Sequence, residues 1–368
     1  MSNSSNLFIG MMSGTSLDGV DTVLVECSGN HFELLRTQHQ PYPDTLKQQL
    51  ESLLADGEQS LSANTSATAD SLADFYADNA LALIQDSGKE ATDIRAIGNH
   101  GQTIWHAPPV SLQLDNAELI AQRTGITVIN QFRQADLAAG GEGAPLVPAF
   151  HQQIFGSDSE DRVVVNIGGI SNVTVLRQDG SVSGCDTGPG NTLLDGWVTA
   201  NRGLPYDDNG QWAKEGSLNP ALLSAMLDDP WLALTPPKST GRELFNLEWL
   251  NRFLKDGFSE IQPADVQATL CELTAASIAK TLSQLQASSS VIAICGGGVH
   301  NSYLMNRLQA QLPDCSVKTT GAWGIEPDWV EACAFAWLAM ARLNNIPGNH
   351  PAVTGASKAC LLGEVHHP

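Results

Sequence analysis

Four glycine-rich turns hold the residues whose types and spacing are best suited to chemistry. They are residues 10–19, 168–172, 184–191 and 296–301, and each lies at the end of a strand-like run or before a helix-like one. Glycine lets backbone N–H groups approach an oxygen closely, and neighbouring hydroxyls add donors. A helix that begins after such a turn adds a favourable dipole. One such turn alone is more typical of a tight hairpin, but four together indicate phosphate binding that needs few Lys or Arg residues.

Common motifs for nucleotide or acyl chemistry do not fit the sequence. The only Gly-Lys pair, at 88–89, precedes Glu90, so the chain has no phosphate-binding P-loop. Residues 14–18 (GTSLD) differ from the G-x-S-x-G nucleophile elbow at the last position. The acids of the first turn, Asp18 and Asp21, are suited to hold Mg²⁺ directly or through water, although the sequence leaves the metal ligands open.

Strand-like and helix-like segments alternate along the chain, which predicts an α/β fold. The predicted strands are Leu7–Ile9, Val20–Glu26, Arg95–Gly98, Ile126–Ile129, Val163–Ile167, Val173–Arg177 and Val291–Cys295. The predicted helices are Thr65–Ile84, Leu119–Thr124, Thr192–Asn201, Ala264–Ala287, Ser302–Gln311 and Asp328–Leu343.

The pattern of strand, glycine turn and strand at residues 7–26 returns at residues 163–177. This repeat predicts a duplicated α/β fold with a cleft between the halves, although two hairpins can also resemble each other by chance. Residues 140–145 (GGEGAP) lie before the second hairpin, and so many breakers in a row predict a crossover or hinge, with Gly140–Gly143 as its flexible part.

Composition limits the classes of partner. The chain has 368 residues and 42% apolar residues, enough for two domains or one large one. Its net charge of −21 and only 19 Lys and Arg residues argue against binding to nucleic acid or an anionic membrane. Seven cysteines without CxxC spacing predict reduced thiols in a cytoplasmic protein and no zinc site, with Cys295 and Cys333 buried in apolar runs.

Six longer strings are specific enough to point to a family. They are Gly10–Asp21, Asn99–Thr103, Gln131–Asp136, Asp186–Asn191, Pro236–Glu243 and Cys295–Asn301. These strings resemble those of the anhydro-N-acetylmuramic acid kinase family over nearly the whole chain. The resemblance implies two ribonuclease H-like α/β domains of the sugar kinase, Hsp70 and actin superfamily around a nucleotide cleft. We expect a sugar- and phosphate-binding domain at 1–139 and a nucleotide-binding domain at 140–368, whose C-terminal segment can return to the first.

The resemblance also implies an activity. The family phosphorylates 1,6-anhydro-N-acetylmuramic acid with ATP while water adds across the anhydro bridge, and the product N-acetylmuramic acid 6-phosphate belongs to peptidoglycan recycling. The expected partners are this small sugar, ATP and Mg²⁺, with a homodimer implied by the family. Two alternatives stay open: another sugar or carboxylate kinase of the superfamily, or a non-enzymatic ATP-gated chaperone or filament subunit. A chaperone would need an added peptide-binding domain, for which two lobes leave no room.

Asp186 is implied to be the general base, because a carboxylate near the anomeric carbon can take a proton from the attacking water. From the residues alone, a cap of the helix after Gly190 explains this aspartate better. The residues expected to contact the nucleotide through their backbone are Gly14, Thr15, Ser16, Leu17, Asp18, Gly19, Val20 and Asp21 for the phosphates, faced by Gly168 and Gly169, with Gly296, Gly297, Gly298 and Asn301 at the adenosine.

Arg133 is expected to bind the lactyl carboxylate or another polar group of the sugar, because a guanidinium suits bidentate recognition. His100 and Gln102 are expected to bond sugar hydroxyls, although for His100 taken alone a structural hydrogen bond is the better explanation. Asp136 is interpreted as the ion-pair partner of Arg133.

Glu331 is expected to contact the sugar, but its spacing from Asp328 also fits a capping box without any binding role. Lys238 and Arg242 are among the few cations near a glycine. They suit contacts with phosphate, and solvent-exposed surface cations are the plainer interpretation.

Overall fold

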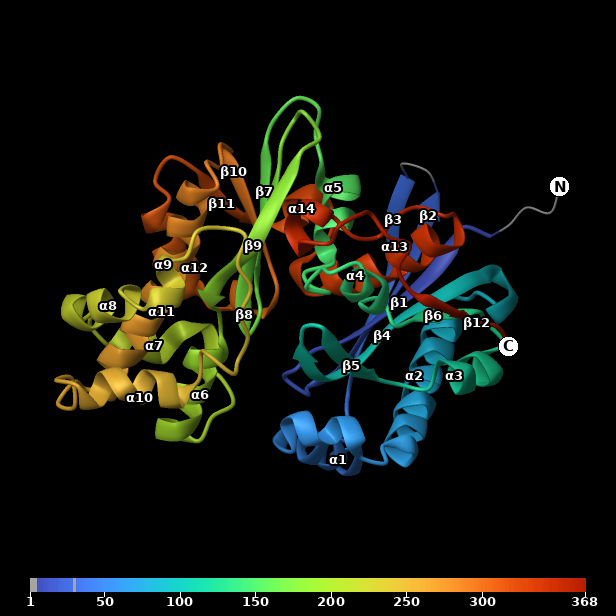
Figure 1. Ribbon diagram of the computed structural model, residues 1–368, viewed down its shortest axis with the longest axis horizontal. Coiled ribbons are helices and arrows are strands. Elements are labelled where there is room, and N and C mark those ends of the chain that lie inside the picture. The colour runs from blue at the N-terminus through green and yellow to red at the C-terminus, as the bar shows by residue number, and fades with distance from the viewer. Residues whose placement is uncertain (1–4, 29–30) are drawn as a thin grey trace. The chain divides into compact units, whose positions relative to one another are not determined.

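The computed structural model describes residues 5–28 and 31–368, which form two compact units. The first unit contains the residues up to Ile154 together with Trp329–Pro368, and the second contains Phe155–Asp328 (Figure 1). The chain therefore returns to the first unit after the second is complete. Residues 140–143, expected to form a hinge, lie inside the first unit.

The first unit is built on a seven-stranded sheet in the order β12-β6-β4-β1-β2-β3, with β5 paired to β4. Strands β1, β2 and β3 are antiparallel neighbours, whereas β4 runs parallel to β1 and β6 runs parallel to β4. The strands are β1 (Leu7–Ser13), β2 (Gly19–Ser28), β3 (His31–Pro41), β4 (Ile94–Ala107), β5 (Val110–Leu114), β6 (Val128–Asn130) and β12 (Glu364–His366).

The second unit has a five-stranded sheet in the order β11-β10-β7-β8-β9. Its strands are β7 (Arg162–Ile167), β8 (Ile170–Leu176), β9 (Val182–Pro189), β10 (Val291–Cys295) and β11 (Ser316–Thr319). Three antiparallel strands are again followed by two parallel ones, next to the first strand. Both sheets thus have the strand order of the ribonuclease H-like fold, which confirms the fold class predicted from the sequence.

A close approach of helix α13 (Val330–Leu343) to the sheet determines the core of the first unit. Gly10 and Gly98 are partners across β1 and β4. A Cβ at Gly10 would lie 1.9 Å from the carbonyl oxygen of Ala332, and one at Gly98 would lie 2.1 Å from that of Phe335. Only glycine lets the backbone of the helix come this near to the strands. The other helices of this unit are α1 (Asp44–Ala55), α2 (Ser66–Asp86), α3 (Ala117–Thr124), α4 (Gln134–Ala138), α5 (Val147–Phe155), whose last residue begins the second unit, and α14 (Pro351–Thr354).

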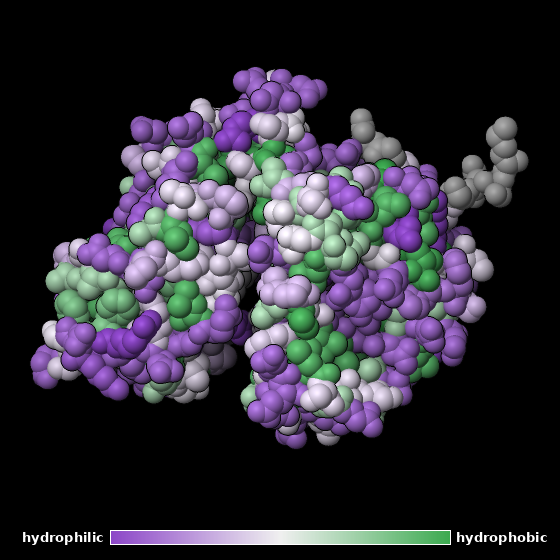
Figure 2. All heavy atoms as spheres, in the orientation of Figure 1, coloured by the Kyte–Doolittle hydropathy of each residue, from purple (hydrophilic) through white to green (hydrophobic). Residues whose placement is uncertain are grey.

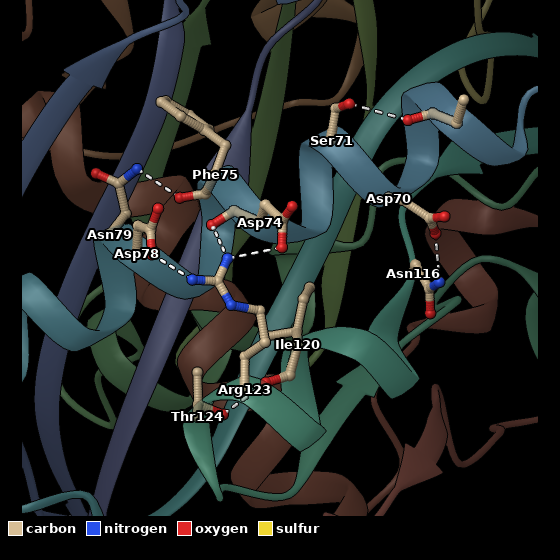
Figure 3. Close-up of polar contacts among 11 residues, drawn as sticks. Asp70, Ser71, Asp74, Phe75, Asp78, Asn79, Asn116, Ile120, Arg123 and Thr124 are labelled. Carbon is tan, nitrogen blue, oxygen red and sulfur yellow. Dashed lines mark hydrogen bonds and ion pairs between the residues drawn. The ribbon is translucent and has the colours of Figure 1, made fainter.

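Helices α2 and α3 pack side by side and are joined by charged groups, as Figure 3 shows. The guanidinium of Arg123 donates to the carboxylates of Asp74 and Asp78, both at 2.7 Å. Asn116 caps the start of α3 by accepting a hydrogen bond from the N–H of Leu119 and also donates to Asp70. The α3 segment predicted from the sequence therefore begins at a side-chain cap, as such helices commonly do.

The second unit is organised around α11 (Pro263–Gln284), a long helix whose residues are mostly buried. Proline at its first position suits a helix start, because the missing N–H would have no partner there. The other helices are α6 (Thr192–Arg202), α7 (Gln211–Glu215), α8 (Pro220–Leu227), α9 (Pro230–Ala233), α10 (Leu247–Lys255) and α12 (Ser302–Gln311).

Two predicted turns lie within strands. The segment 100–103, expected at the end of a strand, is inside β4, which continues to Ala107 and pairs with β5. Residues 184–189, expected in a turn, belong to β9. Glycine misled the prediction in both segments, because Gly101 adopts a φ of +74° within the strand and a Cβ at Gly184 would lie 2.5 Å from the carbonyl oxygen of Val173. These glycines serve close contacts between strands and not chain reversal.

Hydrophilic residues cover much of the molecular surface visible in Figure 2, in keeping with the strong negative charge of the chain. All seven cysteines are free thiols, and Cys295 and Cys333 are buried as predicted. No helix in the described part of the chain combines the length and apolar character that crossing a membrane requires.

The close approach of α13 to the sheet gives a first prediction. Gly10→Ala places a methyl group against a helix carbonyl that cannot move without its helix, so we expect the free energy of unfolding to fall by about 3 kcal/mol. Denaturant unfolding measures it. Gly297→Ala is the matched control, because the nearest atom to a Cβ there lies 3.8 Å away. Equal stability of the two variants would contradict this account of the core.

Candidate active site

The first glycine turn connects β1 to β2 and presents polar side chains to solvent. Thr15, Ser16 and Asp18 are exposed, whereas Leu17 is buried in the core of the first unit. Leu17 has a φ of +55°, a conformation that costs energy for a residue with a side chain. Burial of the leucine side chain therefore holds a strained turn whose backbone and hydroxyls face outward.

A buried hydrogen-bond network supports this turn from below. The amide of Gln102 donates to the carbonyl oxygen of Gly14 at 3.1 Å and accepts from the hydroxyl of Tyr42 at 3.0 Å. Tyr42 contacts the hydroxyl of Tyr76, which donates to Ser13 at the end of β1. Burial raises the pKa of Tyr42 to about 12, so the network is neutral at physiological pH. Gln102, expected at the sugar, is thus engaged in holding the turn.

The remaining residues of the turn are structural in part. Gly19 has a φ of +155°, and a Cβ there would lie 2.1 Å from the carbonyl oxygen of Gln40. Val20 is fully buried in the core. One carboxylate oxygen of Asp21 lies 2.8 Å from Nδ1 of His39 on β3. Asp18 is therefore the exposed carboxylate of the turn.

His100 and Arg133 are brought together as a pair. An Nη of Arg133 donates to Nε2 of His100 at 2.9 Å. Because a guanidinium only donates, the imidazole is neutral and carries its proton on Nδ1, which is buried and has no hydrogen-bond partner among the described residues. Burial and the charge of Arg133 hold the pKa of His100 well below its usual range. The histidine ring also contacts Phe335 of α13.

Arg133 is fixed by further contacts. Its other Nη donates to the carbonyl oxygen of Gly143 at 2.8 Å. Burial lowers the pKa of the guanidinium to about 10, and the charge of Glu331 opposes this most strongly. Asp136, predicted to pair with Arg133, forms no ion pair with it among the described residues, although the charge of Asp136 also raises the pKa of the guanidinium. The fully buried carboxylate of Asp136 accepts hydrogen bonds from the Gly143 N–H, Asn349 and Thr354.

Glu331 lies in the first turn of α13, half-buried and close enough to Arg133 for their charges to interact. The capping box proposed as its alternative role is not formed, because α13 begins after Trp329 without a side-chain cap. Asp328 instead contacts Nε2 of His300 at 2.9 Å within the second unit. Glu331 therefore stays a residue predicted to contact the sugar.

Asp186 lies within β9 and is held by a loop on one side only. Its Oδ2 accepts hydrogen bonds from the hydroxyl of Ser239 at 3.1 Å and from the N–H of Thr240 at 2.9 Å. Its Oδ1 accepts none from the described residues. The residue is only 8% exposed, and it does not cap α6, which begins after Asn191. The capping interpretation of Asp186 is therefore wrong.

The environment of Asp186 moves its pKa toward neutrality. Burial raises the pKa to about 6, the hydrogen bonds from Thr240 and Ser239 lower it, the charge of Glu243 raises it and that of Lys238 lowers it. A carboxylate with this pKa is ionised at pH 7 and is still basic enough to accept a proton. Perturbed acids of this kind are typical of catalytic sites.

The second glycine turn is tied to the start of α6. The carbonyl oxygens of Gly168 and Gly169 accept hydrogen bonds from the N–H groups of residues 190–192. A Cβ at Gly169 would lie 2.8 Å from an Nη of Arg242, so this glycine makes room for the guanidinium. Arg242 thus lies at the turn predicted to face phosphate, whereas the ammonium of Lys238 lies 4.4 Å from the ring centroid of Trp231.

The glycine turn at residues 296–301 has both packed and exposed positions. Gly296 has a φ of +79°, and a Cβ at Gly298 would lie 2.3 Å from the side chain of Ile167. Asn301 caps α12 by accepting from the N–H of Leu304 at 2.9 Å. Gly297 is exposed, and the atom nearest to a Cβ there would be Nδ2 of Asn191 at 3.8 Å. Of this group, Gly297 is the position where a ligand could approach the backbone.

Two features lie apart from the residues predicted to bind sugar or nucleotide. The described residues contain one trio of metal-ligand type, Glu26, His31 and Glu33, at the opposite end of the β1–β2 hairpin from the glycine turn. A cavity of about 290 Å³ lies among α2, α3 and β12, with Asp115 and His366 in its lining. None of the residues predicted to bind sugar or nucleotide lines this cavity.

Comparison with known proteins shows the family of the chain. The family model "Anhydro-N-acetylmuramic acid kinase" matches residues 6–368. The chain belongs to this family. It is 47% identical over 371 residues to the anhydro-N-acetylmuramic acid kinase of Pasteurella multocida, which covers 100% of this chain and 98% of that protein. Identity to the kinase of the same name from Vibrio cholerae is 48% over 367 residues, with 98% of each chain covered.

A solved structure supports the fold independently of sequence. Component A of (R)-2-hydroxyglutaryl-CoA dehydratase from Acidaminococcus fermentans aligns with 90% of this chain and 96% of its own, at a TM-score of 0.50 and 9% identity. At this identity the likeness concerns the fold alone.

The sequence interpretation missed several residues that support the site. Ser239 and Thr240 bind Asp186, and their signal was present in the family string 236–243, which received no such role. Tyr76 lies at helical spacing in α2 and is indistinguishable there from an ordinary core residue, and Tyr42 lies between β3 and α1 without a motif around it.

The pair of His100 and Arg133 gives a second prediction. Because its pKa lies far below 6.5, we expect His100 to keep the ¹⁵N spectrum of a neutral imidazole protonated on Nδ1 between pH 8 and pH 5. The Arg133→Met variant removes the positive charge that helps to lower this pKa, so the pKa of His100 should rise in the variant. Since unfolded chains bind this proton near pH 6.5, the free energy of unfolding should fall as the pH drops below that value. Titration of wild-type His100 near pH 6.5 would contradict the assignment.

Proposed function

We propose that this protein is an ATP-dependent kinase that converts 1,6-anhydro-N-acetylmuramic acid and water to N-acetylmuramic acid 6-phosphate, a reaction of peptidoglycan recycling. Membership of the kinase family supports the substrate and the reaction type. The observation that carries the mechanism is Asp186, a buried carboxylate with one oxygen held by two donors and the other without a donor among the described residues.

In the proposed reaction, Oδ1 of Asp186 takes a proton from the water that attacks C1 of the sugar. The new C1–O bond forms as the C1–O6 bond of the anhydro bridge breaks, and the electron pair stays on O6. O6 then attacks the γ-phosphorus of ATP, and ADP leaves. Hydrolysis and phosphoryl transfer are coupled, because the first step creates the acceptor oxygen of the second.

The glycine turns would bind the triphosphate through backbone N–H groups, with hydroxyls of Thr15 and Ser16 as further donors. Gly168 and Gly169 would bind phosphate in the same way, and Arg242 beside Gly169 adds positive charge in a chain with few cations. Gly297 would lie against the adenosine, because a substituent-free backbone allows close contact.

Magnesium would accompany the nucleotide, and the donors at the first turn fit a hard cation. Exposed Asp18 and the neighbouring hydroxyls are oxygen ligands of the kind that Mg²⁺ prefers, directly or through water. The ion would neutralise charge on the phosphates during transfer. In the first unit, the sugar would contact His100, Arg133 and Glu331.

An isotope experiment tests the function. The protein is incubated with Mg-ATP and 1,6-anhydro-N-acetylmuramic acid in ¹⁸O-labelled water. Label at C1 together with phosphate on O6 supports the proposal. Phosphate without label at C1 indicates an ordinary sugar kinase, and ATP-dependent sedimentation without turnover indicates a filament subunit.

Replacement of the base gives a third prediction. Asp186→Asn keeps an oxygen that can accept from Ser239 and Thr240 but cannot take a proton, so kcat should fall about 10³-fold. Dissociation constants for ATP and sugar, measured by calorimetry, should change little. Turnover near that of the wild type would remove Asp186 from the mechanism.

A fourth prediction concerns the nucleotide. Gly297→Val adds a branched side chain at an exposed position whose nearest neighbour is 3.8 Å from a Cβ, so the fold should tolerate it. We expect the KM for ATP to rise about tenfold, equivalent to about 1.4 kcal/mol, while the KM for the sugar stays the same. Steady-state kinetics with each substrate varied in turn measures both, and an unchanged KM for ATP would count against adenosine binding here.

A further inference from the structure

The loop at residues 236–243 runs along β9, the last strand in the order of the second sheet. Its backbone joins the strand where the N–H of Asp186 donates to the carbonyl oxygen of Lys238 at 3.1 Å. The next residue, Ser239, is exposed, yet its hydroxyl turns inward to the buried carboxylate. The N–H of Thr240 then donates to the same carboxylate oxygen.

We propose that Ser239 is a positioning residue for Asp186, whose hydroxyl holds Oδ2 and so leaves Oδ1 as the proton acceptor. This inference rests on the proposed role of Asp186 as general base. Two donors converge on one oxygen and no described residue donates to the other. The two oxygens of the carboxylate, chemically equivalent in water, are therefore made different by the loop.

The hydroxyl is not required to dock the loop. The backbone hydrogen bond from the N–H of Asp186 to the carbonyl oxygen of Lys238 attaches it to β9, and so does the bond from the N–H of Thr240 to the carboxylate of Asp186. The side-chain bond adds a second donor to a carboxylate that burial would otherwise drive toward its neutral form. Its expected effect is therefore on the orientation and ionisation of the base and less on the stability of the fold.

The charged and titratable groups around Asp186 come from three elements. Lys238 and Glu243 of the loop act on it with opposite signs, and the thiol of Cys185, the preceding residue of β9, stays neutral because burial raises its pKa to about 11. Lys280 on α11 acts on Lys238 in turn. None of these groups is changed by a substitution at Ser239, so a shift in the pH profile would report the lost hydroxyl.

The test is the pH dependence of kcat for the full-length protein with Mg-ATP and the anhydro sugar. In the wild type, activity should be lost as the pH falls through about 6, because Asp186 must be ionised. In Ser239→Ala the charged form loses a donor, so the midpoint of this acid limb should rise by about 0.5–1 pH unit. The plateau of kcat above pH 8 should fall about threefold, and both KM values should stay within about twofold.

Two further variants serve as controls for this result. Ser239→Thr keeps the hydroxyl and should restore the wild-type midpoint. Ser224→Ala, at an exposed serine of α8 in the same unit, should leave the whole profile unchanged. If Ser239→Ala does not fold, Ser239→Thr carries the test, and a shifted midpoint in that variant would overturn the proposal.

A purely structural role for Ser239 would lower the thermal midpoint and the plateau of kcat while leaving the acid limb in place, and that outcome would also overturn the inference. The failure of the inference is distinguishable from failure of the proposed function. An inactive Asp186→Asn with a normal Ser239→Ala profile rejects the positioning role alone, whereas an active Asp186→Asn rejects the general base itself.

Discussion

Burying a carboxylate is costly unless donors compensate for lost water, and the second unit meets this constraint with a loop. Asp186 lies inside β9, where few side-chain donors are available. Two donors from residues 239 and 240 therefore come from another part of the chain. The compensation is incomplete, since the pKa stays near 6 and not near 4. This incomplete compensation makes the group a better base than a solvated aspartate would be.

In the first unit, a buried cation likewise needs partners that compensate for lost water. Arg133 is held by the carbonyl of Gly143 and by the imidazole of His100, and the charge of Glu331 lies nearby. Glu331 lies on α13, and Gly10 and Gly98 allow this helix to approach the strands closely. The two glycines therefore also determine where the charge of Glu331 lies. A substitution in the strands would therefore shift, through the helix, a residue that we propose contacts the sugar.

Much of the fold could be predicted from the sequence, because periodicity reports burial. Strand β10 and helix α12 have the predicted bounds, and the repeated hairpin indicated the repeated sheet order. The errors came from glycine and from contacts between distant residues. Gly101 and Gly184 suggested turns, but they serve close approach within strands. Local patterns do not distinguish these uses, since both require the absence of a side chain.

The candidate site shows the same limit more sharply. Asp186 and Arg133 were found through family strings, whereas their hydrogen-bond partners depend on how loops return to strands. Gln102 lies two residues after His100, but Gly101 between them has a φ of +74°, which interrupts the alternation of a strand. One side chain consequently meets Arg133 and the other supports the turn at Gly14.

The position of Gln102 also affects how firmly the turn at residues 14–19, which we propose binds phosphate, is held. The strained conformation at Leu17 persists only if its surroundings hold it, and Gln102 with the two tyrosines provides part of that support. A turn held by buried neutral groups presents its N–H groups in one arrangement before any ligand arrives. Binding of phosphate then requires little ordering of the backbone, so less of the interaction free energy is lost to conformational entropy. Backbone N–H groups held in this way suit the binding of an anion by an acidic chain that has few positively charged side chains.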